Sequence, residues 1–507
     1  MKRLPLIIVL LAVLLAAAPA EAQKFKTSLG FSFADDNVLR DAGETRNNSP
    51  GPYIGQEPSD FFDDLSDSGF GPSTLHLMFY GAADGIHPRF LPEAAVVLLL
   101  DPIEGDFADG GSYIRASYFF SDERKTGLSL SMFPIDSDRM RLGFHYDISW
   151  GGSDIFPEHF RKGLVPGLKL QLDMDRWYVF AGFKTALVRS PSEDILDNPG
   201  GNTNKIVERA TYGVLAGAGV DIWRGLRFEV NGGYFQKGTN TRQNVLGEPI
   251  HSAGVSGQLS YQEGLPIGRR IDMRLYTEDP IRFDVLAEER YDSGFSWNVA
   301  AEGTGLVQTL EDPDQVNSTM NEWSWAAMLS MRFKYNHFRV HLEGMVRSLP
   351  FITYNVPGFV PYQGLPEAVE TSPEIWAALS ADYFFEHIGL TVAVTGGFLR
   401  PATYRGIVPA GSYPEETLEG VHTVVVRGSQ SGGDWDILPA GEDEMPVFYL
   451  KGTIKWTFGG KFAALAEVNY GRDPNMSQVF RDSRGHAIRR FDDPNILGFG
   501  LLARMSF

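Results

Sequence analysis

The chain has 507 residues, 55 glycines, no cysteine and a formal net charge of −19. Hydrophobic residues make up 43% and aromatic residues 12%, and beyond residue 22 no run of about 18 apolar residues could form a membrane-spanning helix. The absence of cysteine excludes disulfide scaffolds, thiol catalysis and zinc-thiolate sites, and the negative charge disfavours nucleic acid as a partner. Many glycines and aromatics at modest hydrophobicity are typical of transmembrane strands, which carry apolar side chains only at alternate positions.

The first 22 residues have the pattern of a secretory signal peptide. The basic pair Lys2 and Arg3 precedes an apolar core over 4–18, and Ala20-Glu21-Ala22 provides a small-residue cleavage site. An uncleaved anchor helix would need a longer apolar span, and a lipoprotein would need a cysteine. We therefore predict a signal peptide over 1–22 that is removed on export.

The next segment, 23–72, is an acidic leader. Nine Asp and Glu residues lie between 34 and 72, among several Gly and Pro residues. We interpret the segment as a solvated leader, and the alternative is a gate inside a basic lumen. A calcium site over 60–67 lacks the Gly and Glu spacing of an EF-hand loop. Within the leader, 24–33 also alternates in the manner of a strand.

Alternation of apolar and polar residues recurs from 73 to 507. In 139–149, for example, Met140, Leu142 and Ile148 alternate with polar residues over the length of a tilted membrane-crossing strand. The candidate strands are 73–80, 91–100, 112–121, 127–133, 139–149, 165–174, 177–187, 211–222, 225–236, 251–262, 295–304, 323–335, 337–347, 374–385, 388–398, 446–458, 461–471 and 496–507.

These candidates predict an all-β protein, a transmembrane antiparallel up-and-down β-barrel over 73–507. We expect about 18 strands, within a range of about 16 to 20, because 24–33 and a pair within 269–288 could join the barrel. Tight links such as 175–176, 223–224 and 459–460 alternate with long polar connections, as expected for short periplasmic turns and long extracellular loops.

The C-terminus provides a further indication. Leu497, Phe499, Leu501, Met505 and Phe507 alternate with other residues up to the end of the chain. A terminal Phe after such a pattern resembles the assembly signal by which bacterial outer-membrane barrels are recognised for insertion. This resemblance implies the bacterial outer membrane as the location, its lipid and lipopolysaccharide as surroundings, and the barrel-assembly machinery as a partner.

If the apolar residues of each strand face lipid, the residues between them line the lumen. We assign to the lumen the cations Arg115, Arg139, Arg141, Lys169, Lys184, Arg227, Arg270, Arg274, Arg282, Arg332, Lys334, Arg339, Arg347, Lys451, Lys455 and Arg504. The lumen acids are Asp147, Asp173, Asp221, Glu229, Asp272, Asp284, Glu288, Glu302, Glu343, Asp382 and Glu467. Cations outnumber acids, so we predict a net-positive lumen. These charges either hold the wall in shape or offer exchangeable contacts to a passing anion.

An Arg-rich lumen in a barrel of this size is similar to the alginate-type exporters and other porin-like barrels of polysaccharide secretion. That resemblance implies passive export of an anionic polysaccharide, with a periplasmic export protein as a further partner. The chain departs from the exporters because no periplasmic helical-repeat domain precedes the barrel. The alternatives are a general diffusion porin for small anionic solutes and a fatty-acid-type transporter of hydrophobic solutes, whose short hatch would correspond to 34–72.

Other classes fit less well. A TonB-dependent barrel needs a plug domain larger than the residues before the first strands, and an outer-membrane hydrolase or adhesin lacks an identifiable site. His145 and Asp147 would share one face of a strand, but no Ser nucleophile can be assigned beside them. His337 and His341 would lie over about 13 Å apart on a strand, too far to share a metal. We therefore predict no enzyme activity, cofactor or metal.

Overall fold

The computed structural model describes residues 23–35, 38–39, 73–83, 86–100, 107–156, 163–191, 206–240, 245–265, 294–353, 364–365, 367, 369–406, 421–427, 434–459, 461–481 and 487–506. Among these residues, no helix is long and apolar enough to cross a membrane.

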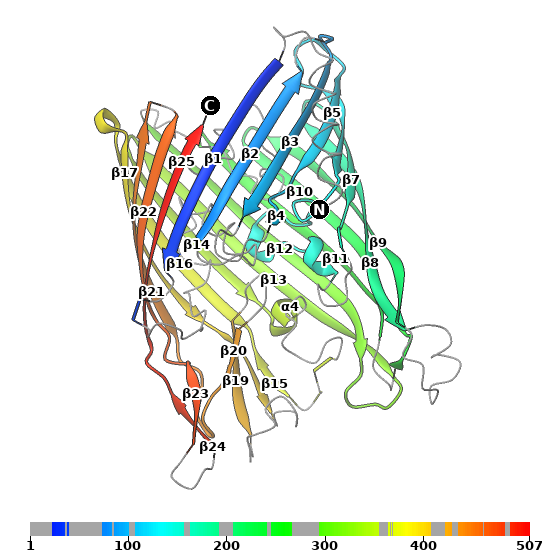
Figure 1. Ribbon diagram of the computed structural model, residues 1–507, viewed down its shortest axis with the longest axis vertical. Helices are drawn as coiled ribbons and strands as arrows, with labels where there is room; N and C mark the ends of the chain where they lie inside the picture. The colour runs from blue at the N-terminus through cyan, green and yellow to red at the C-terminus, as the bar shows by residue number, and fades with distance from the viewer. Residues whose placement is uncertain are drawn as a thin grey trace.

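Eighteen antiparallel strands form a closed barrel (Figure 1). In order around the wall they are β1 (Gln23–Asp35), β2 (Ser73–Ala83), β3 (Phe90–Leu100), β5 (Tyr113–Phe119), β6 (Gly127–Phe133), β7 (Gly167–Asp173), β8 (Trp177–Pro191), β9 (Ile206–Trp223), β10 (Leu226–Thr239), β11 (Pro249–Glu263), β12 (Phe295–Glu311), β13 (Thr319–Tyr335), β14 (Phe338–Arg347), β16 (Glu374–Phe385), β17 (Leu390–Arg400), β21 (Val447–Phe458), β22 (Phe462–Arg472) and β25 (Asn495–Ser506). The short β4 (Phe107–Asp109) adds to β3. Pairing of β1 with β25 closes the ring and leaves the wall without a free edge.

The alternation in the sequence produces two different faces of the wall. On β21, the side chains of Phe448, Leu450 and Ile454 are exposed on the outside, whereas Lys451 and Lys455 between them are buried on the inside. Exposed Leu, Val, Phe and Trp side chains recur on the outer face of the other strands. A closed barrel with an apolar exterior and a polar interior is an outer-membrane barrel, because lipid accepts only the outer face.

The connections between strands alternate in length, as predicted. Turns such as Met174–Arg176, Arg224–Gly225 and Gly459–Lys461 join strands at one end of the barrel, which is at the top of Figure 1. The hairpin turn at Asn336 has φ of 52°, a left-handed conformation that Asn tolerates well. One connection at this end, 264–294 between β11 and β12, is long.

At the opposite end, the long connection between β17 and β21 builds its own structure, the outer lobe. β18 (Ala402–Gly406), β19 (His422–Arg427) and β20 (Asp434–Ile437) form a sheet with β15 (Glu370–Ser372), beside the short helix α4 (Leu349–Thr353). Its buried core is formed by Leu349, Ile352, Ala402, Tyr404, Val424, Val426 and Ile437. A separate hairpin of β23 (Ser477–Arg481) and β24 (Ala487–Phe491) lies at the same end.

Seventeen of the eighteen candidate strands are wall strands, and the prediction for 139–149 is wrong. In the wall, β6 pairs directly with β7 from Gly127↔Asp173 to Phe133↔Gly167, so no strand fits between them. The eighteenth strand is instead β1, which pairs with β2 over 23–33. The barrel therefore begins within the segment predicted as an acidic leader. The signal peptide 1–22, most of 36–72, the segment 269–288 and Phe507 lie outside the described residues.

Candidate functional site in the lumen

The described parts of the connection between β6 and β7, residues 134–156 and 163–166, fold back into the barrel instead of extending from it. We name these residues the inserted loop. It contains the short 3-10 turns η2 (Tyr146–Ile148) and η3 (Ser153–Ile155). Leu142 and Trp150 pair through two backbone hydrogen bonds of 2.6 and 2.8 Å, which bring the two sides of the loop together. Figure 1 shows these cyan segments within the outline of the wall.

The apolar residues that suggested a strand form the core between the loop and the wall. Met140, Leu142, Ile148 and Trp150 are buried, and the Trp150 ring contacts Phe235 of β10 edge to face with centroids 5.5 Å apart. The alternation of apolar and polar residues in 139–149 therefore belongs to a packed loop. Its apolar side chains face the wall, and its polar side chains form hydrogen bonds.

Lys184 of β8 anchors the start of the loop. Its fully buried ammonium donates to the carbonyl oxygens of Ser137, at 2.9 Å, and Gly151, at 2.6 Å. Beside it, Asp138 accepts hydrogen bonds from Arg141 at 2.9 Å and from the Ser153 amide at 3.0 Å. Burial alone would raise the pKa of Asp138, but Arg141 and Lys184 together lower it to about 2. The carboxylate is therefore ionised and fixes the two ends of the loop.

The middle of the loop is held by three neighbouring strands. On β10, Asn231 accepts from the Gly143 amide at 2.8 Å and donates to the Gly143 carbonyl at 3.3 Å. The Trp150 indole N–H donates to Ser256 of β11, and Thr304 of β12 donates to the carbonyl of Ile148. Side chains of the wall thus satisfy backbone groups that the loop cannot satisfy itself.

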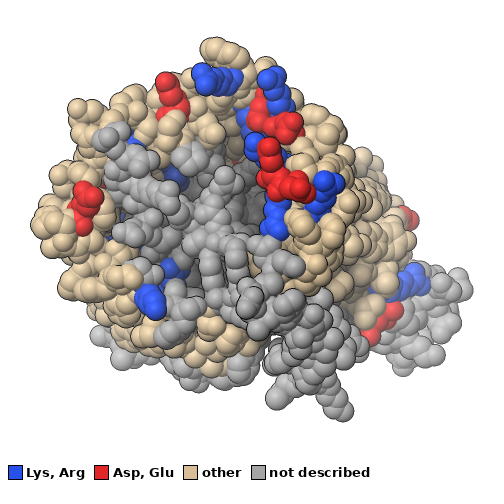
Figure 2. Space-filling view, turned by 90° about the horizontal axis from the view of Figure 1, so that it is seen from above, with Lys and Arg blue, Asp and Glu red and all other residues tan. Residues whose placement is uncertain are grey.

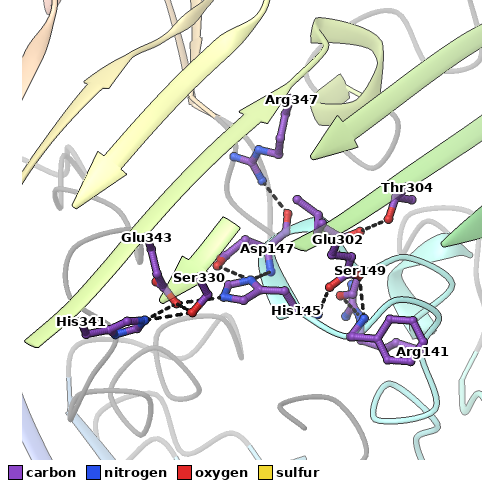
Figure 3. Close-up of polar contacts among 12 residues, drawn as sticks. Arg141, His145, Asp147, Ser149, Glu302, Thr304, Ser330, His341, Glu343 and Arg347 are labelled. Atoms are coloured by element: carbon purple, nitrogen blue, oxygen red, sulfur yellow. Dashed lines mark hydrogen bonds and ion pairs between the residues drawn. The ribbon is translucent and has the colours of Figure 1, made fainter. Parts of the chain in front are cut away.

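Glu302 of β12 receives the tip of the loop (Figure 3). Its two carboxylate oxygens accept the consecutive amides of Phe144 and His145, each at 2.7 Å. Gln258 of β11 also donates to it at 3.3 Å. A buried carboxyl group that accepts two consecutive backbone amides at this distance is a strong local anchor.

The tip ends in a buried cluster of imidazoles and carboxylates (Figure 3). In His145, Nδ1 lies 3.1 Å from Asp147 Oδ2 and Nε2 lies 3.4 Å from Glu343 Oε1 of β14. Glu343 also contacts His341 Nε2 at 2.9 Å and Ser330 Oγ at 3.3 Å. Arg347 of β14 donates to the Asp147 carbonyl at 3.1 Å, so β14 holds the tip at two points.

Many of the predicted lumen cations lie inside the wall and pair with carboxylates. Arg339 contacts Asp382 at 2.7 Å and Arg347 contacts Glu374 at 2.7 Å, with both pairs buried. The other pairs are Arg115 with Glu93 at 2.6 Å, Arg227 with Glu229 at 3.1 Å and Asp221 at 3.3 Å, and Lys451 with Glu467 at 3.8 Å. This pairing makes the inner wall a ladder of mixed charges.

The structure brings together one group of predicted cations on adjacent strands. Lys334 of β13 lies opposite Arg339 of β14 in the register, and Arg332 lies opposite His341. Elsewhere, Lys169 lies over the Phe180 ring at 4.5 Å from its centroid, Lys455 is buried on β21, and Arg504 of β25 is partly exposed.

Arg139 and Arg141 belong to the inserted loop and not to the wall, which corrects their predicted position. Arg141 pairs with Asp138, as described above, and Arg139 donates to the carbonyl of Gly110, between β4 and β5, at 2.8 Å. Arg141 therefore joins two parts of the inserted loop, and Arg139 joins the loop to the segment between β4 and β5. Neither arginine lines the wall.

Sequence reasoning missed several wall residues. Glu374 shares the inward parity of Asp382 on the same strand, so the alternation could have identified it. Lys237, which donates to Gln308 at 2.8 Å, was missed because the predicted strand ended one residue early. Glu93 lies in a strand that is apolar on both faces near its middle, so alternation gave no signal there.

Figure 2 looks onto the short-turn end of the barrel. The described residues form a ring around a hollow, and on this ring Lys and Arg side chains lie close to Asp and Glu side chains.

In the part of the chain that the structure describes, no group of three or more His, Asp or Glu residues is arranged to hold a metal ion.

Neither a protein-family model nor a curated protein matches the sequence. Among solved structures, the chain is similar to Pseudomonas aeruginosa OccK3 (OpdO), with a TM-score of 0.45, 10% identity and coverage of 98% of this chain and 99% of that one. It is also similar to the P. aeruginosa outer membrane protein OpdK, with a TM-score of 0.42, 10% identity and coverage of 96% and 99%. For Acinetobacter baumannii OccAB3 the TM-score is 0.42 at 9% identity, again covering 96% and 99%.

Proposed function

We propose that the protein is a passive diffusion channel of the outer membrane for small polar solutes, narrowed by the inserted loop. The observation that carries this proposal is the combination of a closed wall, a polar interior and a loop fixed inside it from β8 to β14. A polar lumen provides solutes with hydrogen-bond partners in place of water, and a fixed constriction limits their size.

The anchored loop favours small solutes over the polymer that the sequence suggested. An exported polysaccharide needs a continuous wide passage, whereas this loop is held by hydrogen bonds to five wall strands, namely β8, β10, β11, β12 and β14. We therefore propose diffusion of small solutes, and not export of a polysaccharide, as the function of the channel.

The charge pattern of the lumen supports weak ion selectivity. The predicted excess of cations would favour anions, but Arg115, Arg227, Arg339 and Arg347 each contact a carboxylate. Paired charges present a smaller net field to a passing ion than isolated ones. We expect a small preference for anions, from the excess of cations that these pairs leave in the lumen.

Reconstitution into planar lipid bilayers and liposomes tests this proposal. We expect stable conductance steps, a modest reversal potential of the anionic sign in a salt gradient, and swelling rates that fall steeply as sugars become larger. Heat-denatured protein is the negative control. A folded, heat-modifiable barrel that gives neither conductance nor solute flux would contradict the proposal, and a loss of surface polysaccharide on gene deletion would return the preference to export.

A further inference from the structure

His145 is placed between two carboxylates, one on each ring nitrogen. Asp147 belongs to the inserted loop itself, and Glu343 belongs to the wall strand β14 (Figure 3). The side chains of His145, Asp147 and Glu343 are 9%, 2% and 3% exposed, so little water reaches their contacts. The imidazole is therefore a bridge between the tip of the loop and the wall.

The chemistry of this bridge requires a proton. An ionised carboxylate only accepts hydrogen bonds, and a neutral imidazole carries an N–H on one ring nitrogen only. The two carboxylate contacts of His145 are satisfied together only when the ring is an imidazolium with two N–H groups, because a neutral ring whose Nδ1 accepts the Asp147 amide at 3.4 Å donates to Glu343 alone. In the neutral ring, one carboxylate would face a nitrogen lone pair in a buried setting, where such repulsion is weakly screened.

The surrounding charges favour the same protonated state. Glu302 of β12 accepts the His145 amide, and Glu343 of β14 is shared with His341. Two cations near the tip pair with acids, since Arg347 contacts Glu374 and Arg141 contacts Asp138, and Arg332 of β13 lies opposite His341 in the register. The two imidazoles thus contact the carboxylates of Asp147 and Glu343.

We propose that His145 is a positioning residue whose proton fixes the tip of the inserted loop to β14 and so sets the width of the lumen. The effect on width rests on the proposed channel function, but the docking of the tip does not. The docked state binds the proton more tightly than a free imidazole does, so docking is strongest in acid, begins to weaken in the range in which a free imidazole loses its proton, about pH 6 to 7, and is lost above that range.

The docking can be measured without any conductance. Because the chain has no cysteine, Ser149→Cys introduces a single thiol at a buried position near the tip. We expect its rate of labelling by a small thiol reagent, corrected for thiol ionisation with a free-thiol standard, to rise about tenfold between about pH 5 and pH 8.5, the change expected for losing one charge-assisted hydrogen bond.

Two variants in the Ser149→Cys background decide the role of His145. His145→Gln cannot be protonated, so its corrected labelling rate should be high and should not rise further above about pH 7, where Asp136, with a pKa of about 6, no longer titrates. Glu343→Gln should move the transition to lower pH. The matched control is His87→Gln, which removes an exposed imidazole in the turn before β3 and should keep the wild-type profile. Heat-modifiability verifies that each variant is folded.

The same proteins are then compared in lipid bilayers over the same pH range. We expect the wild-type conductance to rise with pH and that of His145→Gln to be high and, above about pH 7, constant. A corrected labelling rate that does not change with pH, or one that in His145→Gln still rises above about pH 7, would overturn the proposal. Absent conductance with pH-dependent labelling would instead remove the channel function and leave the role of His145 in place.

Discussion

The inserted loop and the outer lobe are two long connections from the same end of the barrel, and they satisfy their backbone groups in different ways. The outer lobe pairs β18 with β19 and β19 with β20, and it buries an apolar core of its own. The inserted loop has two isolated backbone bridges, Leu142 with Trp150 and Asp136 with Val165, and it depends on Lys184, Asn231 and Glu302 of the wall.

This difference predicts which substitutions will affect the lumen. A loop that borrows its hydrogen bonds from the wall is coupled to each strand that supplies them, whereas a lobe with its own sheet can change with little effect on the lumen. The wall residues beneath the inserted loop are therefore expected to control passage through the lumen.

The strongest test of this contrast removes each element. Replacing Arg139–Ser149 by a short Gly-Ser linker should leave a folded barrel and raise the single-channel conductance roughly threefold, because the constriction is gone. Replacing β19 and its flanks, 421–438, in the outer lobe should leave the conductance close to that of the wild type. Equal effects of the two replacements would show that the inserted loop is not the narrowest part.

The second test breaks the anchor at β8. Lys184→Met keeps the volume of the side chain but removes the donor of the Gly151 carbonyl and leaves the Ser137 carbonyl with the Met140 amide alone. We expect the loop to lose about 2 to 3 kcal/mol of local stability. Hydrogen exchange of the amides in 137–151 measures this loss.

The matched control is Lys125→Met, at a position whose ammonium is 71% exposed and pairs only with the equally exposed Glu123. It should not change the exchange of the loop. Unchanged protection in Lys184→Met would mean that the remaining contacts, at Asn231 and Glu302, hold the loop alone.

The third test uses the pH dependence of the loop's first turn. Burial, with the nearby carboxylates of Asp138 and Asp109, raises the pKa of Asp136 to about 6. The folded loop therefore binds this proton more tightly than the unfolded chain, and the resulting stability, full below about pH 4, is lost as the pH rises to about 6.

Asp136→Asn should remove this loss because the amide oxygen can still accept the Asp138 N–H, which lies 2.8 Å from the present carboxylate. We expect the variant loop to be about 1 to 2 kcal/mol more stable at neutral pH and its hydrogen exchange to vary less between about pH 4 and 6. Asp175→Asn, in an exposed turn, is the control. A less stable variant at neutral pH would indicate that the charge of Asp136 is needed.

The sequence was sufficient to predict most of the wall, because period-two alternation has one physical cause in a membrane barrel. Each residue on β21 faces either lipid or lumen, so Phe448, Leu450 and Ile454 could be placed outside and Lys451 inside. The same rule led to the error at 139–149, since alternation states which side chains avoid water but not what covers them. Met140 and Leu142 are covered by the wall, and not by lipid.

The site was predicted only in part, for a related reason. Alternation placed Arg339 and Asp382 on the inner face, but their pairing across β14 and β16 depends on the register, which residue types alone do not determine. The wall partner of the His145 ring, Glu343, lies 198 residues further along the chain on β14, and this separation leaves no local signal. The sequence therefore predicted which residue types line the inner wall, but it did not predict how the inserted loop is anchored to that wall.

The smallest effect is expected for the outer lobe. Arg405 contacts Asp443 at 3.3 Å, with side chains that are 47% and 73% exposed. An exposed ion pair of this kind contributes about 0 to 1 kcal/mol, because water and salt screen it. Arg405→Ala should therefore change neither the conductance nor its pH profile, and should lower the stability of the barrel by less than about 0.5 kcal/mol. If bilayer recordings of Arg405→Ala instead showed a wider or a pH-independent channel, the outer lobe would be coupled to the inserted loop after all, and its self-contained sheet would not isolate it from the lumen.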